Sequence, residues 1–211
     1  MNYKNVAVAL LSALAMFGCK STSMTQTKET KKSYVIYDIQ VTDGVTPTQM
    51  SSAIKRALQS NTSSVTIVED LPPYPLPEQA PRFQLTNPFG KNSAMSALAG
   101  GIKIPTCEGA LIYAQAVDSS MSSYGENTQF YTCLWQYKDG YHVDVYTQFQ
   151  IESGGLDNLG QDLVRGIMGD SSQFIPRTIN SIKTNLEELN VQTKLVTAYP
   201  DQLASQLQNT Q

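Results

Sequence analysis

The sequence predicts an α+β fold, in which a roughly five-stranded, mainly antiparallel sheet carries helices on one face. Three observations predict it. The stretch SYVIYDIQV (33–41) alternates with the two-residue period of a strand and is followed by a capped helix and another strand. Two aromatic-rich stretches flank Asp139-Gly140, which is a strong hairpin signal. Apolar residues spaced three and four apart then indicate a helix near the C-terminus.

The first three elements are expected to form a β-α-β unit. Thr46 can cap the helix, Pro47 suits its first position, and Gln49 completes a T-x-x-Q capping box. Residues 63–71 read as the second strand, because they are rich in β-branched side chains. The buried face of the helix is expected to consist of Met50, Ile54, Ala57 and Leu58.

Residues 72–88 contain six of the ten prolines, which excludes a helix or a central strand. We expect an ordered loop across the domain, because it has apolar side chains to bury. The alternative, a proline-rich ligand for the groove of a partner, remains open. Within 93–105 we expect a short helix that ends at Gly100-Gly101. The side chains expected to be buried are Tyr74, Leu76, Phe83, Leu85 and Phe89.

The remaining elements complete one domain over residues 34–199. A strand is expected at 109–117, a short helix at 156–169 and an edge strand at 193–199. Residues 200–211 read as a polar tail. The C-terminal helix begins near Pro176, and its apolar stripe is Ile175, Ile179, Ile182, Leu186 and Leu189.

A two-residue turn at Asp139-Gly140 would pair Lys138 with Tyr141 and sort the hairpin residues onto two faces. The apolar face should carry the helices. The second face could lie under the proline-rich loop, could recognise a protein, peptide or glycan, or could do both. The candidate partner-binding residues on this second face are Tyr131, Trp135, Tyr137, His142 and Tyr146.

The N-terminus has the layout of an export signal over residues 1–18: Lys4, then an apolar run at 6–17 that is too short to span a membrane. Gly18-Cys19 after this run resembles the lipobox of bacterial lipoproteins. The resemblance implies that the signal is removed before Cys19, that Cys19 is acylated, and that Lys20 favours the outer membrane. The alternative is an ordinary secretory signal with a coincidental cysteine. Residues 19–33 would then be the lipidated cysteine and a flexible, lysine-rich tether.

With Cys19 acylated, Cys107 and Cys133 remain, and an even pair in an exported chain predicts a disulfide. A metal pair or a free nucleophile fits poorly with an oxidising compartment and a single histidine. The net charge is −3 and no basic stripe carries interleaved aromatics, so nucleic acid is not expected as a partner. No metal or cofactor is expected.

The sequence contains no complete set of catalytic motifs. Ser52 and Lys55 match S-x-x-K, but the partner motifs S-D-N and K-T-G are missing. A triad of Cys133, His142 and Asp144 fails on strand geometry. The sequence therefore favours a non-catalytic, lipid-anchored envelope protein that binds or helps to assemble an envelope protein partner. The alternatives are a small envelope hydrolase or peptidoglycan-modifying enzyme, and an inhibitor or immunity protein.

Overall fold

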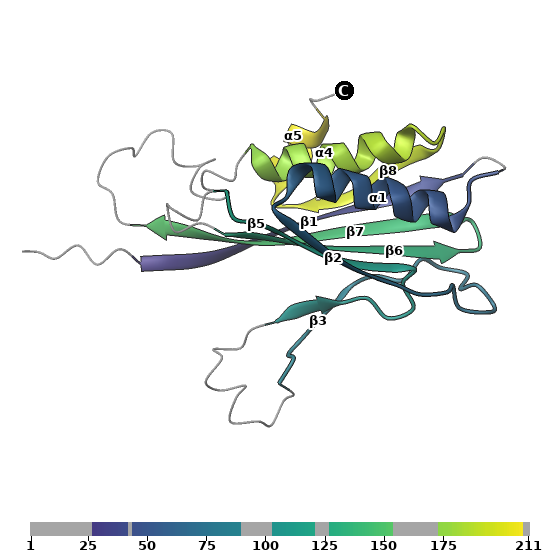
Figure 1. The fold of residues 1–211 in the computed structure, drawn as a ribbon, viewed down its shortest axis with the longest axis horizontal. Coiled ribbons are helices and arrows are strands. Elements are labelled where there is room, and N and C mark those ends of the chain that lie inside the picture. Colours follow the sequence, from purple (N-terminus) through teal and green to yellow (C-terminus); the bar gives the residue numbers. More distant parts are fainter. Residues whose placement is uncertain (1–26, 42–43, 90–102, 121–126, 154–172, 209–211) are drawn as a thin grey trace, which may run out of the picture.

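The computed structural model describes residues 27–41, 44–89, 103–120, 127–153 and 173–208. Its main feature is a six-stranded antiparallel sheet with its helices on one face, so the predicted α+β class is confirmed (Figure 1). The helices are α1 (Pro47–Asn61), α4 (Phe174–Glu187) and α5 (Asp201–Gln208). The strands are β1 (Thr27–Gln40), β2 (Ser64–Glu69), β3 (Gln84–Thr86), β4 (Ile104–Thr106), β5 (Ile112–Asp118), β6 (Thr128–Tyr137), β7 (Gly140–Ser153) and β8 (Gln192–Tyr199).

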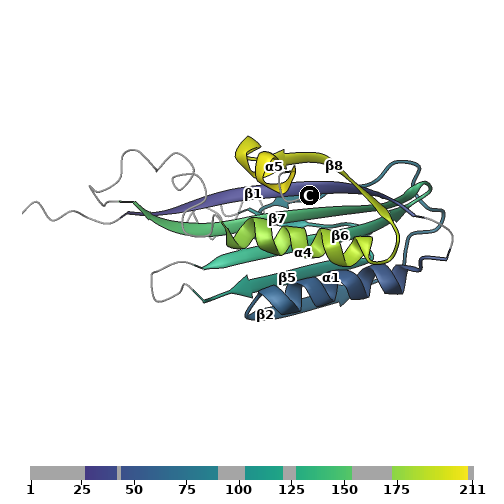
Figure 2. The same ribbon diagram turned by 90° about the horizontal axis from the view of Figure 1, so that it is seen from above.

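The strand order of the main sheet is β2-β5-β6-β7-β1-β8. The predicted β1, α1 and β2 all form, but β1 and β2 are not neighbours, because β5, β6 and β7 lie between them. The crossover through α1 therefore carries the chain from the interior of the sheet to its edge (Figure 2). β8 forms the opposite edge, so the predicted edge strand is confirmed, and its partner is β1.

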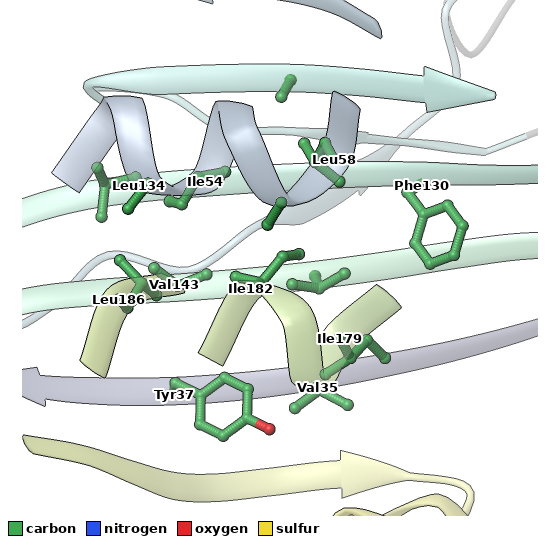
Figure 3. Close-up of a cluster of buried hydrophobic side chains, with 14 of the residues drawn as sticks. Val35, Tyr37, Ile54, Leu58, Phe130, Leu134, Val143, Ile179, Ile182 and Leu186 are labelled. Carbon is green, nitrogen blue, oxygen red and sulfur yellow. The ribbon is translucent and has the colours of Figure 1, made fainter. Parts of the chain in front are cut away.

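Apolar stripes on α1 and α4 pack on the sheet and form the main core (Figure 3). The predicted capping box is present at the start of α1, where the Thr46 side chain accepts a hydrogen bond from the Gln49 backbone. Each fully buried aliphatic side chain in this core contributes about 1.5–3 kcal/mol to stability. The fully buried helix side chains include Met50, Ile54, Leu58, Ile175, Ile179, Ile182 and Leu186.

The hairpin of β6 and β7 turns one residue earlier than predicted. Tyr137 pairs with Gly140, so the loop residues are Lys138 and Asp139, and the predicted pairing of Lys138 with Tyr141 is wrong. The backbone of β1 approaches Gly140 too closely for a side chain, because a Cβ at this position would lie 2.2 Å from the Ile39 carbonyl oxygen. Gly140 also has a φ of +154°, which side chains rarely allow. Each residue of β6 therefore pairs with the β7 residue two positions before its predicted partner. Because this shift is even, every side chain stays on its predicted face.

β1 begins at Thr27, inside the stretch predicted as tether, so the folded domain extends further towards the N-terminus than residue 34. Polar residues form a strand here because β7 continues to Ser153 and offers its backbone as a partner. At the other end, residues predicted as a polar tail form α5, since Leu203 and Leu207 insert into the core.

The proline-rich segment is an ordered loop, as expected, and it leads into a two-stranded sheet of β3 and β4 that we call the flap. Figure 1 shows the flap on the side of the main sheet opposite the helices. Phe83 packs inward as predicted, but Tyr74 is 100% exposed and Phe89 is 41% exposed, so the predicted burial of these two is wrong. The helix predicted at 156–169 and the short helix predicted before Gly100-Gly101 both lie outside the described residues.

Candidate functional site

The candidate site is the second face of the main sheet, which carries all five predicted partner-binding residues. Trp135 pairs with His142 and Tyr131 with Tyr146, so alternate residues of β6 and β7 line this face. Tyr137 lies at the hairpin end of the same row. The five side chains do not form one continuous surface, because the loop and the flap divide the face into a covered centre and two pockets.

Trp135 occupies the covered centre and is 0% exposed. Its indole nitrogen donates a hydrogen bond to the Glu108 carbonyl at 2.9 Å, which satisfies the one polar atom of the ring. Around it lies a small second core that includes Cys133, Cys107 and Phe83. The chain that covers Trp135 is therefore packed against it, and a partner could touch the indole only if this chain moved away.

A disulfide joins Cys107 to Cys133, as the sequence predicted. It connects the end of the flap to β6 across 26 residues of chain. In the chain-entropy model a loop of this length contributes about 3–4 kcal/mol. The disulfide thus fixes the flap above the second face, and it leaves Cys133 without a thiol to act as a nucleophile.

Asp144 is the main electrostatic link between the proline-rich segment and the sheet. Its side chain is 0% exposed, and Oδ2 accepts hydrogen bonds from the Phe83 backbone at 3.0 Å and from Arg82 Nε at 3.3 Å. His142 Nε2 lies 3.1 Å from the other carboxylate oxygen. A buried carboxylate requires such partners, so Asp144 holds the segment in place.

The first pocket of this face, of about 430 Å³, lies at the hairpin end beside Tyr137 and His142. The Tyr137 hydroxyl donates to Asp38 at 2.7 Å. Burial, and then this hydrogen bond, raises the pKa of Tyr137 to about 12, so the phenol keeps its proton at neutral pH. His142 is 5% exposed, and its Nδ1 lies 3.8 Å from Asp38. Lys194 and Glu78 complete the rim.

The second pocket is an open groove of about 610 Å³ between the flap and the other end of the face. Tyr131 and Tyr146 lie on its floor with ring centroids 6.3 Å apart. The Tyr131 hydroxyl donates to Gln129 at 2.7 Å. Burial raises the pKa of both phenols, and they therefore remain neutral hydrogen-bonding groups. Leu85 and Ile104 of the flap provide an apolar wall.

Among the described residues, no three or more His, Cys, Asp and Glu side chains gather into a group that could hold a metal ion. Ser52 and Lys55, the S-x-x-K pair, are both exposed on α1 rather than directed into a pocket. The groove instead offers hydroxyl, amide and ammonium groups, which suit hydrogen bonding and charge pairing.

Sequence reasoning missed the residues that other segments bring to this face, above all Arg82, Asp38, Lys32 and Lys103. One signal was available. Asp144 lies between Val143 and Val145 in a strand, so a buried charge there needed a cation, and Arg82 is the only one in the proline-rich segment. Nothing in the sequence indicated that Lys32 and Lys103 line one groove.

No family model matches this chain, and no curated protein matches it. None of the helices in the described part of the chain is long and apolar enough to cross a membrane.

Proposed function

We propose that this chain is a lipid-anchored protein of the bacterial cell envelope, held at the periplasmic side of the outer membrane by acyl chains on Cys19. In this proposal it catalyses no reaction and binds or helps to assemble an envelope protein partner. The observation that carries the binding role is the open groove above Tyr131 and Tyr146. The centre of the second face is covered by the chain itself, whereas the groove presents partly exposed polar side chains that can meet a ligand.

The chemistry of the groove supports binding rather than catalysis. Its floor consists of tyrosines whose pKa values are raised by burial, so neither phenol is prepared to act as a base or nucleophile near neutral pH. The flap above it is fixed at one end by the disulfide and by Asp144, which keeps the groove preformed. A preformed site loses less entropy when it binds.

A crosslinking experiment tests the partner. A photo-crosslinking amino acid placed at Gln129 or Gln150, which are partly exposed in the groove, should capture one dominant envelope protein in living cells. The same amino acid at Arg56, exposed on α1, should not capture it. Recovery of the same products from all three positions would contradict a role for the groove, and an enzyme as the captured partner would favour an inhibitor.

The anchor gives a separate prediction. Replacing Cys19 with serine removes the sulfur that the lipobox resemblance assigns to acylation, so the protein should move from the membrane fraction to the soluble periplasmic fraction. Intact-mass analysis of the wild type should find acyl chains on the mature N-terminus. A C107S variant serves as the control for loss of a cysteine and should stay with the membrane. Unchanged membrane retention of the Cys19 variant, with no lipid on the wild type, would contradict the anchor.

A further inference from the structure

The groove has the length of a short extended peptide. Its floor follows β7 from Tyr146 to Gln150, and neighbouring β6 and β1 widen it on either side through Gln129 and Thr30. Four residues of strand span roughly 13 Å, which matches about four residues of an extended chain. The groove therefore has room for a peptide lying along the strands.

The flap is fixed over this groove by a hydrogen bond as well as by the disulfide. Gln148 Nε2 donates to the Lys103 carbonyl at 3.0 Å and approaches the Tyr146 hydroxyl at 3.4 Å. This contact holds the backbone of Lys103 at the edge of the groove and leaves its side chain exposed. Leu85 and Ile104 then present apolar surface between the polar floor and solvent.

The described lining of the groove carries a charge opposite to that of the whole chain. Lys32 and Lys103 are its charged lining residues, both are exposed, and no aspartate or glutamate lines it among the described residues. The chain as a whole has a net charge of −3. A local positive potential in an acidic protein attracts anionic groups and repels cationic ones.

The remaining polar groups match the backbone of a peptide. Glutamine side chains carry the same donor and acceptor groups as a peptide bond, and Gln129 and Gln150 are both partly exposed in the groove. Two ammonium groups at its rim can pair with carboxylates spaced along the same segment.

We propose that the groove binds an acidic, extended segment of the envelope partner, with Lys32 and Lys103 pairing with its carboxylates and glutamine side chains bonding to its backbone. The proposal rests on the partner-binding function above and adds the chemistry of the segment that is bound. Because both cations are exposed, the segment should bind weakly at high salt and more tightly at low salt.

A peptide titration tests the proposal on the full mature chain carrying Cys19→Ser, so that acyl chains make no contribution. The probe is a fluorescein-labelled peptide of sequence Gly-Glu-Ser-Glu-Val-Glu-Gly. The control peptide, its match, has glutamine in place of each glutamate. Fluorescence anisotropy should show saturable binding of the acidic peptide and at least tenfold weaker binding of its match. Adding Lys32→Gln and Lys103→Gln together should weaken binding about tenfold.

The matched control is the pair Lys55→Gln and Arg56→Gln, which removes the same charge from exposed positions on α1. This control should change the affinity less than twofold. Equal affinity of the groove variant and the wild type, or no saturable binding of the acidic peptide, would overturn the proposal. Lysine-dependent binding to phosphatidylglycerol vesicles in place of the peptide would also overturn it, and would assign the two lysines to a lipid surface.

The two proposals fail separately. A dominant partner crosslinked at Gln129, together with peptide binding that ignores the lysines, would reject the acidic segment and retain the partner-binding function. Peptide binding that depends on the two lysines, without any crosslinked partner, would retain the preference of the groove for acidic segments. It would reject the partner-binding function proposed for the groove.

Discussion

Replacing Trp135 with alanine should lower the free energy of unfolding by about 3–5 kcal/mol. The indole is 0% exposed, and it fills the space between β6 and the chain around Glu108. Alanine would leave a cavity there and an unpaired carbonyl at Glu108. Urea unfolding followed by circular dichroism measures the loss. Tyr74→Ala is the matched control, because Tyr74 is an aromatic side chain with full exposure and should change stability by less than about 0.5 kcal/mol.

Trp135 was also predicted to bind a partner, so crosslinking from Gln129 should be measured on the same variant. If the indole serves only to stabilise the fold, the amount of partner recovered per folded molecule should equal that of the wild type. A normal free energy of unfolding with lost recovery would contradict the structural role and would support direct recognition by Trp135.

The second large effect is expected at Asp144. Asp144→Ala should cost about 1–3 kcal/mol, because the Phe83 backbone N–H loses its acceptor inside the protein. The Arg82 side chain also loses its ion-pair partner, but it is 45% exposed and can be hydrated instead. Glu78→Ala is the control. Its ion pair with Lys138 also joins the proline-rich segment to the hairpin, but both of these side chains are mostly exposed, so the loss should stay below about 1 kcal/mol.

Limited proteolysis gives a second measurement of the same link. Trypsin should cleave after Arg82 faster in the Asp144→Ala variant than in the Glu78→Ala variant, since the segment no longer bonds to the sheet. Equal cleavage rates and equal free energies of unfolding in the two variants would show that Asp144 does not hold the segment.

Local patterns were sufficient to predict most elements. The capping box at Thr46 and the apolar stripe that begins at Ile175 identified α1 and α4, because both signals depend only on neighbouring turns of one helix. The alternation in β6 and β7 assigned each side chain to the correct face of the sheet. The assignment is correct although the predicted register was wrong by two residues. The register itself depends on the close approach of Gly140 to Ile39, which is a contact across about 100 residues of chain.

Segments with weak patterns were harder to predict. Residues 27–33 have no apolar period, and they become a strand because β7 provides a backbone to pair with. Leu203 and Leu207 lie in a polar stretch, and only the core beside β8 gives them a place to be buried. In the site, the five predicted residues share a face through alternation alone. Lys103 reaches this face through the path of a distant segment, which no local signal encodes.

β1 has a mechanical consequence for a protein held by its N-terminus. The strand that leads from the proposed anchor lies between β7 and β8, and its ladder with β7 runs from Thr27 to Ile39. Ladder hydrogen bonds run perpendicular to the strands, so a pull along β1 loads them together in shear rather than opening them one at a time. A pull on the proposed anchor would therefore load the whole ladder between β1 and β7 at once, so this end of the domain should resist unfolding more than a strand peeled from an edge.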